Sequence, residues 1–275
     1  MTSTRSLMMS LCSGLALLAG CQAPAPVSPA ARAPLADQTL PYSFRTRAFD
    51  GSSLWQVLRE DSKGFLIRQS LPDLKLSRIP MPAVPPQHRS LAWGRNALWM
   101  LDYSDRLYQI DPADGKILAS LDLADLPETR ASEQIVWSGD QLWLLMRPYV
   151  SSNNKLEPSR FIRLDPASGK SLETRTIAGE VNTLPRPSLG FSDFVHQNLS
   201  ADQEAFYVLR SDLYVAEANR LYRIDKQSLA VTQTPLSRVY TGVPTLFFRQ
   251  GQPWAVELLD TTNCGEFCRG KLQKL

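Results

Sequence analysis

The chain has 275 residues, of which 43% are hydrophobic and 21% charged. Its 30 basic and 27 acidic residues give a net charge of +3, and the two signs are interspersed without a cationic block. This pattern lacks the electrostatic signature of a nucleic-acid-binding protein, so we expect no nucleic acid partner.

The first 20 residues have the pattern of a secretory signal. Arg5 precedes an apolar run from Leu7 to Ala19, and a Leu-Ala-Gly box ends just before Cys21. This arrangement resembles a bacterial lipoprotein signal peptide. The resemblance implies that residues 1–20 are removed and that Cys21 becomes a lipidated first residue carrying palmitate-like acyl chains. A retained transmembrane helix is the alternative, but it needs about 20 apolar residues and this run is shorter.

Residues 21–39 are expected to act as a tether. Ala and Pro dominate from Ala23 to Ala36, and almost no large apolar side chain is present. Such a segment cannot bury enough surface to offset the entropy lost on ordering, so we expect an extended connection between lipid and domain. Gln22 follows the lipidated cysteine, and the lipoprotein resemblance then implies the outer membrane, with the protein on its periplasmic side.

A repeat extends through the remaining residues, 40–275. Aromatic residues inside short apolar stretches stand at Trp55, Trp99, Trp143, Tyr207 and Trp254, and the first three recur at intervals of 44 residues. A period in the forties built from short strands is typical of a β-propeller, because one such sheet cannot bury its faces alone whereas a closed ring can. We therefore predict an all-β fold, a five-bladed β-propeller of four-stranded antiparallel blades. The aromatic row is expected to pack between neighbouring blades.

The second and third blades have the clearest pattern. Their predicted strands cover 90–93, 97–101, 106–110 and 116–121 in the second blade, and 134–137, 142–146, 160–164 and 170–177 in the third. Between the last two strands of each blade lies an Asp-Pro-Ala-x-Gly-Lys turn, beginning at Asp111 and at Asp165. In such a turn the carboxylate bonds backbone amides ahead of it, Pro fixes φ, and Gly takes a position with positive φ.

The other blades diverge from this pattern. Predicted strands cover 54–58, 64–68 and 74–79 in the first blade, a run from Phe194 through 206–209, 220–224 and 229–235 in the fourth, and 245–248, 254–258 and 271–274 in the fifth. The fifth blade lacks a fourth strand, and we expect residues 40–43, upstream of the first blade, to supply it. Such closure would hide two sheet edges that otherwise invite aggregation.

These units resemble the YVTN and quinoprotein-like β-propeller repeat superfamily. Its repeats carry a comparable strand, an Asp-x-x-x-Gly-Lys turn and a following strand, and the resemblance covers most of residues 40–275. It implies a fold and no particular activity, because that superfamily includes enzymes, scaffolds and ligand sensors.

Cys264 and Cys268 are the thiols that remain once the signal is removed and Cys21 is lipidated. Their spacing suits a small disulfide loop, which an oxidising compartment would preserve. A redox pair and half of a metal site are the alternatives. Redox motifs normally place two residues between the cysteines, and a zinc site would need further ligands nearby, so we expect a structural bridge.

Long insertions gather in one class of connection. In a four-stranded meander, the links between second and third strands and the links between blades share one face of the ring. That class holds residues 80–89, 147–159, 178–193, 211–219 and 264–268. Because long loops on a rigid scaffold usually carry recognition, we expect binding on this face. Its candidate contact residues are His88, Arg147, Tyr149, Arg186, Phe191, Asp193 and His196.

Catalysis on the same face is the open alternative. His196 could act as a general base near Asp193, or both could join Asp212 and Glu217 as metal ligands. No Gly-rich phosphate loop, His-rich metal motif or nucleophile elbow is present in the sequence, and we expect no metal or cofactor.

The sequence therefore predicts a membrane-anchored lipoprotein whose propeller is a binding or scaffold module. An envelope protein or a cell-wall component is the expected partner. The alternative is a periplasmic hydrolase, lyase or cyclotransferase with its site at the axial mouth of the propeller.

Overall fold

The computed structural model describes residues 39–42, 46–71, 73–123, 126, 132–146, 149–150, 156–177, 199–210, 220–236, 245–258 and 268–275. The chain divides into two compact units, residues 1–34 and 35–275, and every described residue belongs to the second. Among these described residues, none forms a helix with the length and apolar character that a bilayer crossing requires.

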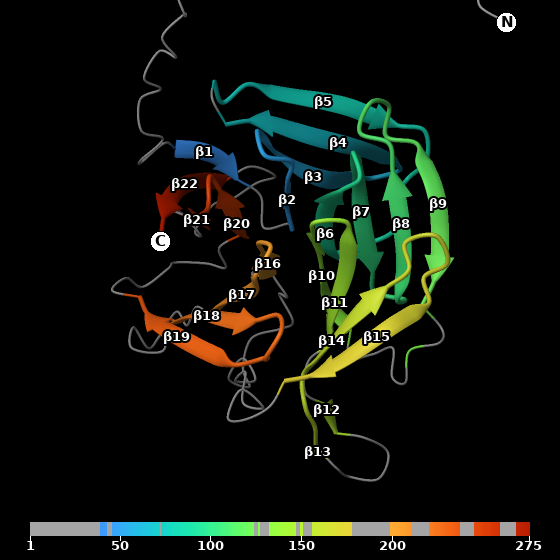
Figure 1. The fold of residues 1–275 in the computed structure, drawn as a ribbon. Coiled ribbons are helices and arrows are strands. Elements are labelled where there is room, and N and C mark those ends of the chain that lie inside the picture. The colour runs from blue at the N-terminus through green and yellow to red at the C-terminus, as the bar shows by residue number, and fades with distance from the viewer. Residues whose placement is uncertain are drawn as a thin grey trace, which may run out of the picture. The chain divides into compact units, whose positions relative to one another are not determined.

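The described strands form five four-stranded antiparallel sheets and one short hairpin (Figure 1). The first sheet contains β2 (Ala48–Phe49), β3 (Ser53–Glu60), β4 (Lys63–Ser70) and β5 (Leu76–Met81). The second contains β6 (His88–Gly94), β7 (Ala97–Asp102), β8 (Arg106–Ile110) and β9 (Ile117–Asp122). The third contains β10 (Ser132–Ser138), β11 (Gln141–Met146), β14 (Arg160–Leu164) and β15 (Ser171–Thr176).

The remaining sheets follow the same order of strands. The fourth contains β16 (Leu199–Ala201), β17 (Ala205–Arg210), β18 (Arg220–Asp225) and β19 (Val231–Pro235). The fifth contains β20 (Thr245–Arg249), β21 (Gln252–Leu258), β22 (Cys268–Lys274) and, outermost, β1 (Thr39–Tyr42). β1 pairs antiparallel with β22, so Thr39 stands opposite Lys271 and Tyr42 opposite Cys268. The hairpin joins β12 (Tyr149–Val150) to β13 (Leu156–Glu157) within the link from β11 to β14.

The first strands of the five sheets contact one another in sequence. β2 contacts β6, β6 contacts β10, β10 contacts β16, β16 contacts β20, and β20 contacts β2 again. Because each sheet meets its neighbours through the same strand, the arrangement is that of an all-β propeller with four-stranded antiparallel blades, as the repeat predicted.

Five separate hydrophobic clusters lie between neighbouring sheets. The cluster between the second and third sheets, for example, combines Trp99 and Leu107 with Trp137 and Ile162. Trp55, Trp99 and Trp143 are each 4% exposed or less, and Tyr207 and Trp254 are partly buried against neighbouring clusters. The aromatic row therefore packs between the sheets, fully in the first three repeats and partly in the last two. Each buried large side chain contributes about 1.5 to 3 kcal/mol of transfer free energy, so these interfaces hold the sheets together.

In three of the repeats the polar atom of the aromatic residue bonds to the turn that precedes its strand, whereas the buried Trp143 Nε1 has no hydrogen-bond partner among the described residues. Trp55 Nε1 donates to Asp50 Oδ2 at 2.7 Å, and Tyr207 OH donates to Asp202 Oδ2 at 2.9 Å. Trp99 Nε1 donates to the main-chain oxygen of Gly94 at 3.1 Å. A hydrogen bond to the polar atom lowers the cost of burying an indole or phenol, so these turns and the three aromatic side chains stabilise one another.

The turns between third and fourth strands have the chemistry expected from their sequences. Asp165 Oδ1 accepts from the Ala167 amide at 3.0 Å, and the Gly169 amide donates to Asp165 O at 2.8 Å with φ of +74° at the glycine. Leu74 and Leu229 take the same left-handed position in the first and fourth sheets, with φ of +57° and +56°. Both leucines pack against hydrophobic clusters, and this burial offsets the strain of a side chain at positive φ.

The structure differs from the sequence prediction around residues 80–89. Pro80 belongs to β5 and His88 begins β6, so the link between these sheets covers residues 82–87. Pro80 is tolerated because β5 is an outer strand, where a missing N–H removes no required ladder bond. The short strands β2, β12 and β13 were not predicted, because two-residue strands carry no periodicity. Phe194 lies outside the described residues.

Candidate binding face and axial cavity

The connections between strands are unequal on the two sides of the sheets. Links between first and second strands, and between third and fourth strands, are short turns. The other links include residues 147–159 between β11 and β14, 177–198 between β15 and β16, and 259–267 between β21 and β22. Strand alternation places all links of this second kind at one side, which we call the loop face. A similar face on any rigid scaffold is where recognition residues usually lie.

The turn between β7 and β8 is the best described part of the loop face. Asp102 Oδ1 accepts hydrogen bonds from the amides of Ser104 and Arg106, both at 2.8 Å. Tyr108 OH donates to Asp102 Oδ2 at 3.1 Å, and burial together with this carboxylate raises the pKa of Tyr108. One aspartate therefore holds the turn in a single conformation and presents Tyr103, which is 54% exposed.

A buried ion pair between β6 and the turn also holds this turn in place. Arg89 Nη2 lies 3.3 Å from Asp105 Oδ1, and Arg89 Nε donates to the main-chain oxygen of Asp102 at 2.9 Å. Both charged side chains are less than a tenth exposed. The Arg89 guanidinium also lies 5.3 Å from the ring centroid of Tyr103, in cation–π range. The exposed Tyr103 side chain thus packs on a turn that is held by hydrogen bonds and by the Arg89–Asp105 ion pair.

The residues predicted for this face are only partly described. His88 is half-buried at the start of β6, opposite Asp102 in the strand register. Tyr149 begins β12 and pairs with Glu157 through the backbone. The other candidates lie outside the described residues: Arg147, Arg186, Phe191, Asp193 and His196, with the possible metal ligands Asp212 and Glu217.

Sequence reasoning missed Tyr103 and the pair Arg89–Asp105. The available signal was the Asp-Tyr-Ser-Asp run at residues 102–105, which is turn chemistry around an aromatic residue. Cys21 and Cys264 lie outside the described residues, and Cys268 begins β22, so lipidation and the disulfide remain predictions. Within the described ranges, no group of three or more His, Cys, Asp or Glu side chains is arranged to hold a metal ion.

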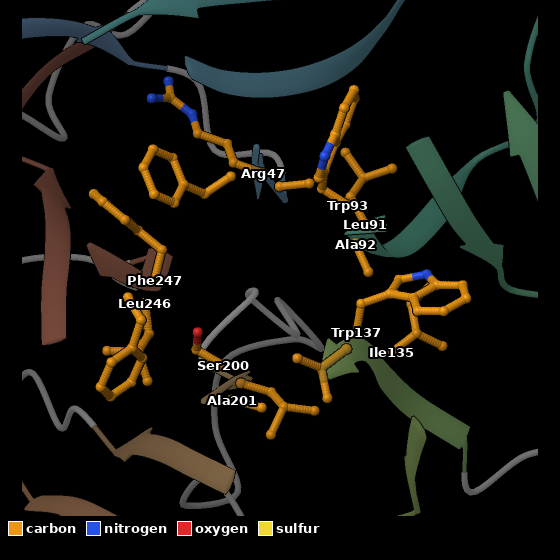
Figure 2. A pocket seen from close by; sticks show the side chains of 15 residues that line it. Arg47, Leu91, Ala92, Trp93, Ile135, Trp137, Ser200, Ala201, Leu246 and Phe247 are labelled. Atoms are coloured by element: carbon orange, nitrogen blue, oxygen red, sulfur yellow. The ribbon is translucent and has the colours of Figure 1, made fainter. Parts of the chain in front are cut away.

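A cavity of about 120 Å³ lies among the first strands of the five sheets (Figure 2). Each of β2, β6, β10, β16 and β20 contributes residues to its wall. These strands are the inner edges of their sheets, so their backbone groups on that side have no ladder partner within the sheet. The cavity therefore combines polar backbone edges with apolar side chains.

The side chains around the cavity are mostly apolar. Leu91, Ile135 and Phe247 are among them, whereas Arg47 and Ser200 are the charged and hydroxyl side chains of the wall (Figure 2). A volume near 120 Å³ has room for a few waters at roughly 30 Å³ each, but drug-sized ligands occupy pockets of about 300 to 1,000 Å³. The volume of the axial cavity is therefore sufficient for a few ordered waters and too small for a drug-sized organic substrate.

These features define the class of the protein, a β-propeller with unequal faces. No family model matches the sequence, and no curated protein matches it either. Solved structures of similar fold include a glutaminyl cyclase and a WD40 domain. A glutaminyl cyclase of Myxococcus xanthus matches at a TM-score of 0.38 and 13% identity, over 68% of this chain and 70% of that one. The WD40 domain of Toxoplasma gondii coronin matches at a TM-score of 0.38 and 9% identity, over 80% of this chain and 57% of that one. At these scores the likeness carries no argument about activity.

Proposed function

We propose that this protein is a lipid-anchored, five-bladed β-propeller that binds an envelope protein or cell-wall component through its loop face. The observation that carries the proposal is the inequality of the two faces: nearly all long links lie on one side of the sheets. Folding of the sheets alone does not require the long links to lie on one side. Recognition surfaces are commonly built in this way.

The five-bladed ring is the framework of the proposal. Five sheets, five hydrophobic clusters and a circuit of contacts through β2, β6, β10, β16 and β20 support it. In this arrangement β1 completes the last blade, because it covers the edge of β22 that would otherwise be open. The chain just upstream of β1 would then lead to the lipid at Cys21.

Tyr103 supports a binding role for the loop face. Aromatic anchors at interfaces combine large contact area with few side-chain torsions, and they bind best when they are held in place beforehand. Asp102 and Arg89 hold the Tyr103 turn as described above. The axial cavity, at about 120 Å³, leaves little room for the enzymatic alternative at the axial mouth.

Site-specific photocrosslinking in the native cells tests the choice of face. A photoreactive phenylalanine analogue at position 103 is expected to crosslink a partner, whereas the same residue at Ala113 is expected to crosslink none. Both positions are exposed, and they lie in the turns at opposite ends of β8, which makes the second a matched control. Crosslinks of equal yield at the two positions, or at Ala113 alone, would overturn the assignment of the loop face.

Lipidation is tested independently of binding. Cells grown with an alkyne analogue of palmitate should label the wild-type protein, and Cys21→Ser should abolish the label and release the protein from the membrane fraction. A labelled Cys21→Ser protein would show that the lipid is attached elsewhere and that the proposed anchor is wrong.

A further inference from the structure

Ser138 and Lys226 meet on the face opposite the loop face, where the β10–β11 turn of the third sheet approaches the β18–β19 turn of the fourth. Lys226 Nζ donates to Ser138 Oγ and to the main-chain oxygen of Asp202. Ser138 Oγ donates its own hydrogen to the same oxygen at 2.7 Å. Two residues 88 positions apart are thus brought into hydrogen-bond contact by the packing of two sheets.

This pair departs from the repeat at both positions. Lys226 follows the turn aspartate, where the equivalent turns of the second and third sheets have Pro112 and Pro166. Ser138 stands at the end of β10, where the second sheet has Gly94 at the end of β6. Because the equivalent turns form with proline or glycine, which have no polar side-chain atom, turn formation does not require a lysine or a serine at these positions.

The surroundings of Lys226 make its amine easier to deprotonate than that of an exposed lysine. Burial lowers the pKa of Lys226 to about 8, and the negative charge of Asp202 only partly opposes this effect. The Asp202 carboxylate is already used by the amides of Glu204 and Ala205, at 2.8 and 2.7 Å. The elements around the amine carry the charged side chains Asp140, Glu173, Arg175, Asp202, Glu204, Arg223 and Asp225.

These charges are largely satisfied among themselves. Arg175 pairs with Glu173 at 2.5 Å, and its guanidinium also donates to the main-chain oxygen of Lys226. Arg223 lies 3.5 Å from Glu204 and 4.0 Å from Asp225. Asp202 therefore remains as the anion that raises the lysine pKa, and it does not cancel the cost of burial.

We propose that Ser138 and Lys226 form a nucleophile and general-base pair that accepts acyl groups from activated esters. The geometry has the three parts that such a pair needs: a hydroxyl, a base within hydrogen-bond reach of it, and a third group, the Asp202 carbonyl, that orients the base. Gly139 and Asp140 are the central residues of the β10–β11 turn, outside the ladder that joins Ser138 to Gln141. The proposal assigns stabilisation of the developing oxyanion to the amides of these two residues.

The reaction balances with water as the only co-reactant. Once Lys226 has lost its extra proton, the Ser138 hydroxyl rotates so that its hydrogen points from the Asp202 oxygen to Nζ. Neutral Nζ takes that proton as Ser138 Oγ bonds to the acyl carbon, and the ammonium then gives it to the departing alkoxide. Water next attacks the Ser138 ester while Nζ takes the water proton. The bond from the acyl carbon to Oγ breaks, the proton passes from Nζ to Oγ, and the carboxylic acid leaves.

A fluorophosphonate probe tests the pair without knowledge of the natural substrate. The full-length protein in detergent is incubated with the probe at pH 7 and pH 9, and the adduct is located by peptide mass mapping. We expect one adduct on Ser138, formed about tenfold faster at pH 9, because a base with a pKa near 8 is mostly charged at pH 7 and mostly neutral at pH 9. An unlabelled Ser138 in the folded protein would overturn the proposal.

Three variants separate a reactive pair from a structural one. Lys226→Arg retains the charge and donor capacity but cannot act as a base. A general base usually accelerates a reaction by about 10² or more, so the rate of labelling should fall at least tenfold. Ser228→Ala removes an exposed serine that bonds Asp225 at 2.8 Å in the same turn as Lys226, and labelling should be unchanged. Ser138→Gly, which restores the glycine of the second sheet, should fold and remain unlabelled. Labelling of Lys226→Arg at the wild-type rate would contradict the role of the lysine, and it would leave the loop-face proposal unaffected.

Discussion

Replacing Gly169 by Ala is expected to destabilise the protein by more than replacing Gly251 by Ala. The two glycines have nearly the same backbone conformation, with φ of +74° and +71°, so each substitution carries a left-handed strain of about 1 to 2 kcal/mol. A Cβ at position 251 would meet nothing within 4 Å. A Cβ at position 169 would lie 3.2 Å from both Asp122 O and Leu121 Cβ, and 3.3 Å from Leu123 Cδ2.

The extra cost at position 169 comes from crowding between the second and third sheets. Overpacking of this kind costs about 1 to 3 kcal/mol, in addition to the strain that both variants share. For a domain of this size, about 1 kcal/mol corresponds to roughly 2 to 4 °C in Tm, so Gly169→Ala should melt at least about 2 °C below Gly251→Ala. Tryptophan fluorescence during heating, repeated with urea at 25 °C, measures both differences. Equal stabilities of the two variants would refute the contact between the third-sheet turn and the end of β9.

Two further predictions concern charged groups. Because the pKa of Lys226 is lowered to about 8, the unfolded chain binds more protons than the folded one between about pH 8 and 10.4, and the free energy of unfolding should rise with pH across that window. Urea unfolding at pH 8 and 10 should show this rise, and Lys226→Met should remove it; a rise of the same size in the variant would assign it to another group. Arg89→Met should cost about 3 to 5 kcal/mol, because it leaves Asp105 buried without its cation, whereas Arg106→Met, at an exposed pair 4.0 Å from Asp122, should cost less than about 1 kcal/mol. Similar melting temperatures for Arg89→Met and Arg106→Met would contradict the burial of the Arg89 pair.

Local turn chemistry explains why much of the fold was predictable. The turns at Asp111 and Asp165 have the same sequence pattern and the same hydrogen bonds, with the Gly115 and Gly169 amides donating back to their aspartates at 2.9 and 2.8 Å. Such turns are specified by residues next to one another, and they divide the chain into strands whose alternation shows which face is buried. The strands of the second and third sheets therefore agree with prediction to within about two residues at each end, the usual uncertainty of helix and strand boundaries.

The candidate sites depended on contacts that no local pattern records. His88 was expected in a loop, but the ladder with Asp102 extends β6 to include it. Tyr103 is held over the buried guanidinium of Arg89, a contact between residues 14 positions apart that no local pattern predicts. Leu229 stands where two other sheets have glycine, and it is tolerated because a neighbouring sheet buries its side chain.

The repeat, the order of consecutive strands and the unequal distribution of loops follow from the sequence, because each depends on residues close together in the chain. The tertiary structure alone decided which turns meet across the boundaries between sheets. Ser138 and Lys226 are ordinary residues in their own turns, and they become a hydrogen-bonded pair only through the packing that buries Phe206 and Trp143 between the third and fourth sheets. That packing is a property of side chains from distant repeats, so it appears only when the sheets are assembled.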